Sequence, residues 1–245
     1  MKRSSPLDIE AVILAGGLGT RLRPALPDCP KALAPVAGRP FITVLLDQLA
    51  AAQFRSVTLL VGYRADQIQE MLGANHDGLS LTYEVEASPL GTAGALRRAL
   101  PRFKAKTILV MNGDSFCDVD VRALADQHYR SRADLTIVVA QAPDTRRFGR
   151  VELTSAGKAA AFVEKSEGGP GNINAGIYLL ERTLITEIPA GRPVSLERDM
   201  LPLWLGARRI HGFPASGRFL DIGTPADYAA AEDLLEVEAR SCPLS

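Results

Sequence analysis

Apolar, β-branched runs of strand length alternate with segments of helical apolar spacing over residues 1–140, and this alternation limits the fold more than any other feature. Such a repeat is typical of α/β proteins, in which the connecting helices pack on a mainly parallel sheet. The expected strands are Ala11–Leu14, Val57–Val61, Leu81–Val85, Thr107–Met111 and Leu135–Ala140. The expected helices are Phe41–Ala52, Ala65–Leu72, Thr92–Leu100 and Val121–Arg130. The spacing therefore predicts an α/β fold with helices on both faces of the sheet.

The pattern changes after Arg150, where shorter strands follow one another through turns that contain glycine and proline. The expected strands are Arg150–Leu153, Ala159–Glu164, Ile173–Leu180, Arg209–Phe213 and Arg218–Leu220, and the expected helices are Ser195–Leu205 and Pro225–Glu236. We expect this half to extend the same sheet. The chain then forms one domain over residues 9–238 with two functional halves, 9–150 and 151–238, between a polar N-terminal tail (1–8) and a C-terminal tail (239–245).

The charge balance excludes one broad class of partner. Lysine plus arginine and aspartate plus glutamate both number 28, so the formal net charge is zero. A protein that grips nucleic acid nonspecifically usually has an excess of basic residues, so we expect no nucleic-acid partner. The three cysteines have no spacing typical of a zinc site or a disulfide framework. No apolar run reaches the ~20 residues of a membrane span, so we expect a cytoplasmic protein with no membrane partner.

A glycine turn lined with cations follows the first expected strand. Gly16, Gly17 and Gly19 come first, and Arg21 and Lys31 follow. Open α/β sheets bind ligands beyond the carboxyl ends of their strands, and backbone N–H donors beside cations suit a phosphate chain. A P-loop would end in Gly-Lys-Ser/Thr, and a dinucleotide fingerprint would need glycine or alanine at position 22, which is leucine. The glycines alone are equally consistent with a structural turn.

The stretch Gly-Gly-Leu-Gly-Thr-Arg-Leu-Arg-Pro (16–24), followed by Pro-Lys-Ala-Leu-Ala-Pro (30–35), resembles the signature of the sugar-1-phosphate nucleotidyltransferases. The resemblance implies a Rossmann-like three-layer α/β/α fold with a mixed, mainly parallel central sheet, of the nucleotide-diphospho-sugar transferase type. It also implies that Arg21 and Lys31 are the catalytic cations that clamp the phosphates of a nucleoside triphosphate. Arg23 has a weaker case, since a second cation two residues on is often an ordinary solvated side chain.

Further motifs follow in the family's order over residues 10–235. Glu86–Gly94 resembles the base- and ribose-binding loop, and Val110–Asp114 resembles the strand that ends in the first metal-binding aspartate. Phe162–Lys165 resembles the pair that holds the sugar and its phosphate, although Ser166 stands where many members have proline. The remaining matches are Asn-Ala-Gly-Ile-Tyr (174–178), Ser-Leu-Glu-Arg-Asp (195–199) and Phe-Leu-Asp-Ile-Gly-Thr-Pro (219–225).

The resemblance implies three groups of site residues. The nucleotide-binding residues are Leu14, Ala15, Gly16, Gly17, Gly19, Thr20, Arg21, Lys31, Glu86, Pro89, Leu90, Gly91, Thr92, Asn112 and Gly113. The sugar-phosphate-binding residues are Gly149, Glu164, Lys165, Asn174 and Gly176. The metal ligands are Asp114 and Asp221, and the metal is Mg²⁺.

Single positions also have purely structural interpretations. Asp114 at a strand end could cap a helix, and Thr92 could be the N-cap of the helix that begins there. Asp221 could be a turn residue, and Glu164 with Lys165 could be solvated charges on a strand edge. The order and spacing of all the motifs together favour the functional interpretation.

The resemblance implies an Mg²⁺-dependent enzyme that joins a nucleoside triphosphate to a sugar 1-phosphate and releases pyrophosphate. Among members, the chain looks most like the D-glycero-α-D-manno-heptose-1-phosphate guanylyltransferases, which implies GTP, that sugar phosphate, and GDP-heptose for capsule, O-antigen or S-layer glycan synthesis. Mannose-1-phosphate guanylyltransferases and N-acetylmuramate-1-phosphate uridylyltransferases are the alternatives within the class.

Two alternatives come from other classes. One is a catalytically idle regulatory subunit that senses nucleotide sugars, and the other is a dehydrogenase, which Leu22 and the loop cations disfavour. The chain ends without the β-helical extension of larger members, so we expect no added acyltransferase or assembly domain. A homodimer is left open.

Overall fold

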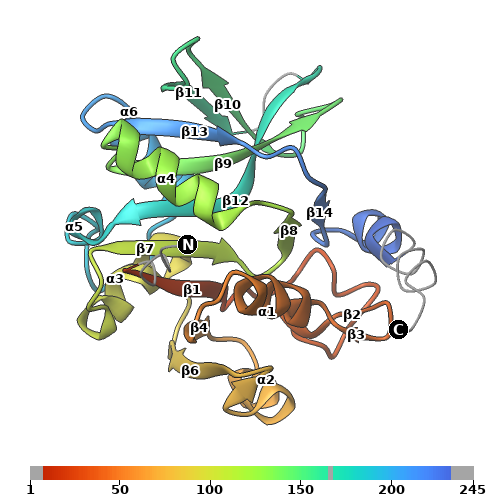
Figure 1. Cartoon of the computed structure of the whole chain (residues 1–245). Helices are drawn as coiled ribbons and strands as arrows, with labels where there is room; N and C mark the ends of the chain where they lie inside the picture. The colour runs from red at the N-terminus through yellow and green to blue at the C-terminus, as the bar shows by residue number, and fades with distance from the viewer. Residues whose placement is uncertain (1–7, 165–167, 233–245) are drawn as a thin grey trace, which may run out of the picture.

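The computed structural model describes residues 8–164 and 168–232. A mixed sheet of ten strands runs through the middle of this part of the chain (Figure 1). The strand order is β11-β10-β12-β7-β1-β4-β6-β5, with β9 pairing with β12 and β13 pairing with β9. The sheet strands are β1 (Ile9–Ala15), β4 (Ser56–Val61), β5 (Asn75–His76), β6 (Leu79–Val85), β7 (Thr107–Asn112), β9 (Leu135–Ala142), β10 (Gly149–Leu153), β11 (Ala159–Glu164), β12 (Gly171–Glu181) and β13 (Ile210–Pro214).

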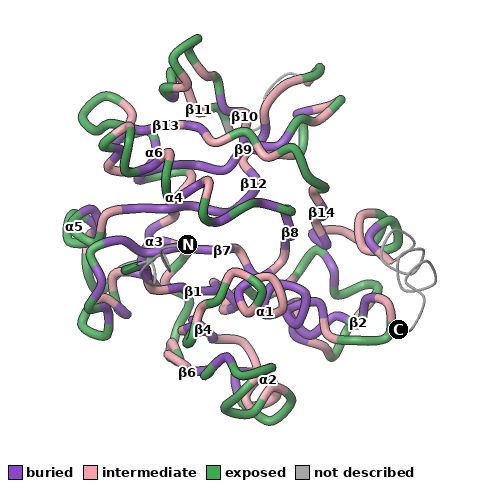
Figure 2. Tube along the Cα trace, in the orientation of Figure 1, coloured by how far each residue is buried: buried purple, intermediate pink, exposed green. Residues whose placement is uncertain are grey.

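Strand β1 lies at the centre of the sheet and pairs in parallel with β4 on one side and with β7 on the other. Ala11, for example, lies opposite Val57 in β4 and Leu109 in β7. β6 continues the parallel arrangement next to β4. β1 and β7 are largely buried, as Figure 2 shows in purple, because a parallel sheet is covered on both faces. The predicted mainly parallel arrangement is confirmed.

Helices cover both faces, and each one contributes buried apolar residues to a core. The helices are α1 (Phe41–Ala51), α2 (Ala65–Leu72), α3 (Gly91–Ala99), α4 (Val121–Ser131), α5 (Arg182–Ile185) and α6 (Leu201–Leu205). Leu45 of α1, Ile68 of α2 and Leu124 of α4 belong to one hydrophobic core. Leu96 of α3 and Trp204 of α6 belong to a second core. Burying one such side chain contributes about 1.5–3 kcal/mol, and the two cores confirm the predicted three-layer α/β/α fold.

The second half extends the sheet through β12, which runs antiparallel to both β7 and β9. The register of β12 against β9 shifts between Asn174 and Tyr178, which marks a β-bulge or irregularity. Gly176 lies in this stretch with a φ of 75°. A Cβ at this position would lie 2.6 Å from Ser115 Oγ. Position 176 therefore needs glycine both for its backbone conformation and for space.

One predicted strand does not join the main sheet. β14 (Phe219–Asp221), which the sequence predicts as Arg218–Leu220, pairs antiparallel with β8 (Ser115–Cys117) in a separate two-stranded sheet. The prediction that the whole second half extends one sheet is therefore wrong for this strand. The physical reason is that β8 follows directly after β7 and presents its own backbone edge, to which β14 binds.

Several segments differ in detail from their predicted limits. The predicted helix Ser195–Leu205 divides into a π-helical turn (Leu196–Met200), capped by the Ser195 hydroxyl, and α6. The predicted helix Pro225–Glu236 is helical through residue 232, and its remainder lies outside the described residues. The sequence predicts none of four short elements, namely the 3-10 helices Lys31–Leu33 and Leu100–Arg102 and the hairpin of β2 (Pro35–Val36) and β3 (Arg39–Pro40).

Gly91 opens α3 with a φ of 70°, and a Cβ there would lie 2.6 Å from the Val194 carbonyl oxygen. Because a backbone carbonyl cannot move aside as a side-chain end can, we expect Gly91→Ala to lower the free energy of unfolding by about 2–4 kcal/mol. Urea denaturation measures this loss. Gly78→Ala is the control, since Gly78 has a φ of 83° and no atom within 4 Å of a Cβ. An equal loss in the two variants would contradict the role of the Val194 contact.

Candidate active site

A cavity of about 230 Å³ lies beyond the carboxyl ends of β1 and β7. This is the edge at which open α/β sheets bind ligands, and β8 and β14 lie next to it in Figure 1. Eleven of the predicted nucleotide-binding residues line it, namely Leu14, Ala15, Gly16, Gly17, Lys31, Glu86, Pro89, Gly91, Thr92, Asn112 and Gly113. The structure thus brings three separate sequence motifs to one cavity. Their roles in binding stay predictions.

Four predicted nucleotide-binding residues, Gly19, Thr20, Arg21 and Leu90, do not line this cavity. Arg21 and Thr20 are exposed at the outer end of the glycine turn. Gly19 has a φ of 60° and turns the chain there. The nearby Arg23 guanidinium lies 4.9 Å from the centre of the Tyr63 ring, which agrees with a structural role for this cation.

The Glu86 side chain packs against the glycine turn at Gly16. A Cβ on Gly16 would lie 2.5 Å from Glu86 Oε1, so glycine at position 16 makes room for this carboxylate. The Leu90 N–H donates a hydrogen bond to Glu86 Oε2 at 3.1 Å. Burial raises the pKa of Glu86, while the Leu90 N–H and the charge of Arg98 oppose that change. Glu86 therefore supports the loop with one oxygen, and its side chain also lines the cavity.

Asn112 and Gly113 form the end of β7 beside the cavity. The Oδ1 atom of Asn112 is buried and has no hydrogen-bond partner among the described residues. A buried acceptor without a partner costs free energy unless a ligand or water supplies a donor. Gly113 lies against β1, where a Cβ would come within 2.7 Å of the Leu14 carbonyl oxygen. The end of β7 is thus suited to receive a ligand that carries hydroxyl groups.

Asp114 and Asp221 come together through the pairing of β8 with β14. Asp221 lies opposite Ser115 in this pairing, and the Ile222 N–H donates to the Asp114 carbonyl oxygen at 3.0 Å. Burial, and then the negative charge of Asp114, raise the pKa of Asp221 to about 6. The Gly223 N–H donates to Asp221 Oδ1 at 2.7 Å and opposes this shift. The two carboxylates therefore repel each other, a situation that a cation relieves.

Lys31 supplies one such cation. Its Nζ lies 2.6 Å from Asp114 Oδ2, and its side chain is only 12% exposed, against 40% for that of Asp114. Asp114 lines the cavity and Asp221 does not. Two carboxylates from distant chain positions are oxygen donors of the kind that Mg²⁺ prefers. The pair therefore fits a divalent cation. The alternative that Asp114 caps a helix is wrong, because Asp114 lies in the turn between β7 and β8.

Thr92 is not the N-cap of α3, since Leu90 occupies that position without a side-chain cap hydrogen bond. The Thr92 hydroxyl instead donates to Glu197 Oε2 at 2.9 Å and accepts from the Leu196 N–H at 2.7 Å. The structural interpretation of Thr92 as a cap is therefore wrong. Its side chain connects the nucleotide loop to the segment before α6.

The predicted sugar-phosphate-binding residues lie on β10, β11 and β12. Gly149 and Glu164 are opposite each other in the pairing of β10 with β11. Asn174 Oδ1 accepts a hydrogen bond from the Gly176 N–H at 3.1 Å. A Cβ on Gly176 would lie 2.9 Å from the Asn112 side chain, which places this part of β12 next to the end of β7. Lys165 lies outside the described residues.

Sequence reasoning missed part of the apolar cavity wall. This part comprises Leu18, Ala32, Leu60 and Ala95. Ala95 follows Gly91 by about one helical turn, so both lie on the same face of α3, and helical spacing could have predicted Ala95 as a lining residue. Leu60 lies in β4 and is almost fully buried, and nothing in the sequence separates it from the core residues around it. Glu197 was part of a matched motif but had no predicted role.

The sequence profile of the family described as Nucleotidyl transferase matches residues 10–238. The chain belongs to the nucleotidyl transferase family. It is 39% identical over 224 residues to a mannose-1-phosphate guanylyltransferase of Mycobacterium tuberculosis, covering 90% of the chain and 62% of that relative. It is 33% identical over 228 residues to a D-glycero-α-D-manno-heptose 1-phosphate guanylyltransferase of Aneurinibacillus thermoaerophilus, covering 93% of the chain and 99% of that relative. The recognition made from the sequence is confirmed at the level of the family.

Solved structures of similar proteins agree with the fold of this nucleotidyl transferase. HddC from Yersinia pseudotuberculosis has a TM-score of 0.83 and 32% identity, and the match covers 92% of the chain and 99% of HddC. A second HddC structure, complexed with GMP-PN, matches equally well at 31% identity. A glucose-1-phosphate thymidylyltransferase candidate from Bacillus anthracis has a TM-score of 0.84 but 23% identity, so it supports the fold alone.

Among the residues that the structure describes, one other group of side chains has the geometry of metal ligands. Asp47, His76 and Asp77 place ligand atoms within 4.8 Å of one another, on α1 and around β5. Asp47 already pairs with Arg39 and with His76 Nε2. None of these residues lines the cavity, so this group adds nothing to the candidate site. No helix in residues 8–164 and 168–232 is long and apolar enough to cross a membrane.

Proposed function

We propose that this nucleotidyl transferase joins GTP to a sugar 1-phosphate and releases pyrophosphate. The observation that carries the proposal is the cavity lined by the glycine turn, Lys31 and Asp114, with Asp221 held beside Asp114 by the pairing of β14 with β8. An oxygen of the sugar 1-phosphate attacks the α-phosphorus of the nucleotide. A new phosphorus–oxygen bond forms, and the bond between the α-phosphorus and the bridging oxygen breaks as pyrophosphate leaves.

Charge neutralisation is the main requirement of this reaction, because two anions must approach each other. Lys31 and Arg21 supply positive charge for the triphosphate. A Mg²⁺ ion bound by Asp114 and Asp221 would neutralise phosphate oxygens at the reacting end. The attacking phosphate oxygen is already anionic, so the reaction needs no general base. The chain's contribution is then to position the substrates and to stabilise charge.

D-glycero-α-D-manno-heptose 1-phosphate is the favoured sugar substrate, with GDP-heptose as the product. The support is the match to the heptose relative, of which this chain covers 99%. Mannose 1-phosphate is the second candidate, because this chain has a higher sequence identity, 39%, to the mannose-1-phosphate relative. The test is a matrix of nucleoside triphosphates, including GTP and UTP, against heptose, mannose and N-acetylmuramate 1-phosphates, read by pyrophosphate release. A regulator without catalytic activity would release none with any pair.

The proposal includes three finer points. The metal is Mg²⁺, the protein works in the cytoplasm, and a homodimer is the assembly to be tested. Activity titrations with a series of divalent cations test the first point. Cell fractionation and light scattering test the other two.

Glu86→Gln tests how the base is selected. Guanine presents N1–H and N2–H₂ on one edge, and a carboxylate can accept both. If Glu86 binds guanine, the variant should lower kcat/KM for GTP by at least about tenfold and leave kcat/KM for UTP nearly unchanged. The reason is that a buried N–H donor of guanine left without an acceptor costs free energy. Steady-state kinetics with both nucleotides measure the difference. An equal loss with GTP and UTP would mean that Glu86 acts only through its bond to the Leu90 N–H.

A further inference from the structure

A single carboxylate, that of Glu197, lies between the two predicted substrate regions. Its Oε2 accepts hydrogen bonds from the Thr92 hydroxyl at 2.9 Å and from the Ser195 hydroxyl at 3.0 Å. Its Oε1 accepts from the Tyr178 hydroxyl at 3.0 Å. These contacts join α3, the turn before α6 and β12, which are far apart in the sequence. Both carboxylate oxygens are therefore committed to holding other side chains.

One arm of this network reaches the nucleotide region. Thr92 lines the cavity, and its oxygen already accepts from the Leu196 N–H at 2.7 Å. The neighbouring backbone is tied to the same segment, since the N–H groups of Ala93 and Gly94 donate to the Val194 carbonyl oxygen at 3.0 and 3.1 Å. The proton of the Thr92 hydroxyl then needs an acceptor, and Glu197 supplies it. The start of α3 is thus fixed by residues 194–197.

The other arm reaches the predicted sugar region. Tyr178 is fully buried, and its oxygen accepts from Asn174 Nδ2 at 2.6 Å while its proton goes to Glu197. Asn174 Oδ1 accepts from the Gly176 N–H at 3.1 Å, so both ends of the amide are oriented. An asparagine amide has two N–H donors and two acceptor sites, so one of each stays available on Asn174 for a ligand. Glu197 therefore determines the direction in which Asn174 presents these groups.

We propose that Glu197 is a positioning residue that holds the nucleotide loop and the sugar-binding Asn174 at a fixed relative geometry. It need not contact either substrate, because its contacts pass through Thr92 and Tyr178. This inference rests on the proposed function, in which one substrate lies at each arm. A shift of about 1 Å between two reacting groups can lower a rate by ~10²-fold, so a shared anchor matters for turnover.

The test measures binding of nucleotide and of sugar 1-phosphate separately by calorimetry, together with kcat, in four variants. Thr92→Val should weaken nucleotide binding about tenfold and leave sugar phosphate binding unchanged, and Tyr178→Phe should do the reverse. Glu197→Ala should weaken both about tenfold and lower kcat by ~10–10²-fold. Thr92→Ser keeps the hydroxyl and should restore nucleotide binding.

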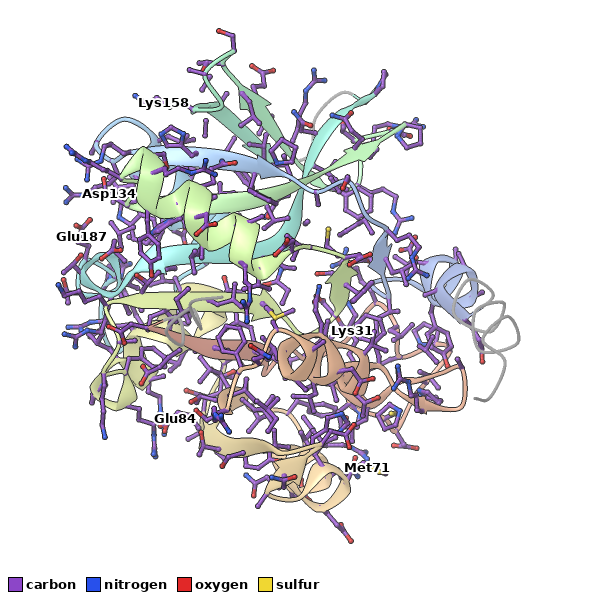
Figure 3. All side chains as sticks on the ribbon, in the orientation of Figure 1. Lys31, Met71, Glu84, Asp134, Lys158 and Glu187 are labelled. Atoms are coloured by element: carbon purple, nitrogen blue, oxygen red, sulfur yellow. The ribbon has the colours of Figure 1, made fainter. Side chains whose placement is uncertain are left out.

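Glu197→Gln is the second variant for the case that Glu197→Ala does not fold. An amide has one acceptor atom, whereas the Thr92 and Tyr178 hydroxyls donate to different oxygens of Glu197, so this variant must weaken binding of at least one substrate and lower kcat. Glu187→Gln is the matched control, because the Glu187 carboxylate also anchors a buried residue, Trp204, through a 2.9 Å hydrogen bond. Figure 3 labels Glu187 at the left edge of the view and Lys31 near its centre, and Glu187 does not line the cavity, so its substitution should change only stability.

Two results would overturn the inference. A lower melting temperature in the folded Glu197 variants, with unchanged binding and kcat, would show a purely structural role. Weaker binding of the sugar phosphate alone in Glu197→Ala, with Thr92→Val behaving as wild type, would show that Glu197 contacts the sugar directly. The binding measurements use the nucleotide and sugar that the wild-type chain binds, so a different base or sugar would correct the proposed function and leave this test intact. Should the wild-type chain bind both but turn over neither, the proposed function fails and the two binding constants still decide the role of Glu197.

Discussion

Replacing Asp114 or Asp221 with asparagine is expected to lower kcat by about 10²–10³-fold, the scale of losing one electrostatic stabiliser in an active site. Asparagine keeps the size of the side chain and removes the charge that would bind a divalent cation. The two carboxylates lie close enough for Asp114 to raise the pKa of Asp221, so they are expected to act as one cation site. Chelation should abolish turnover in the wild-type protein, and added Mg²⁺ should restore it. Pyrophosphate release measures both effects.

Asp120→Asn is the control for these variants. Asp120 caps α4 by accepting hydrogen bonds from the backbone N–H groups of Arg122 and Ala123. Asparagine caps helices about as well as aspartate, so this variant should keep both its stability and its activity. Near-normal kcat in Asp114→Asn would contradict the assignment of Asp114, even if the protein still required a divalent cation.

Lys31→Met is expected to lower kcat/KM for the nucleotide by about 10²-fold or more. Methionine keeps much of the apolar length of the side chain and removes its charge, which the proposal assigns to the triphosphate. The variant also leaves Asp114 and Asp221 without the cation that lies 2.6 Å from Asp114. Steady-state kinetics at fixed sugar phosphate concentration measure the loss. Lys31→Arg, which keeps the charge, should retain a larger share of the activity.

Lys158→Met is the control for the loss of one positive charge. Lys158 is exposed near the β10–β11 hairpin, well away from Lys31 in Figure 3. The variant should leave kcat/KM unchanged. The clamp assigned to Lys31 is incorrect if Lys31→Met loses only stability and keeps its kinetics.

The sequence was sufficient to predict the layered architecture. Apolar β-branched runs such as Val57–Val61 coincide with the parallel strands, because a strand covered on both faces must be apolar along most of its length. Helix limits were predicted within one or two residues where the apolar spacing is regular, as in Ala65–Leu72. The boundaries of the domain and of its two halves stay predictions.

The sequence also led to most of the cavity, because its motifs follow directly after strands. Gly16 and Asn112 each lie at the carboxyl end of a strand or just beyond it, and the parallel pairing of β1 with β7 sets Asn112 opposite Leu14, two residues before Gly16. Arg21 is the exception among the clamp residues. Its side chain is exposed and does not line the cavity, and no strand register fixes where that side chain lies.

The sequence by itself determined the helices and strands and the functional side chains that lie at their ends. The tertiary structure alone decided which of these ends meet. Asp221 reaches Asp114 only because β14 leaves the main sheet and pairs with β8. Glu197 holds Thr92 and Tyr178 only because the turn before α6 packs on the start of α3. The first contact depends on a backbone edge and the second on hydroxyl groups, and in both cases the partner lies far away in the sequence. Local spacing carries no information about such long-range pairing.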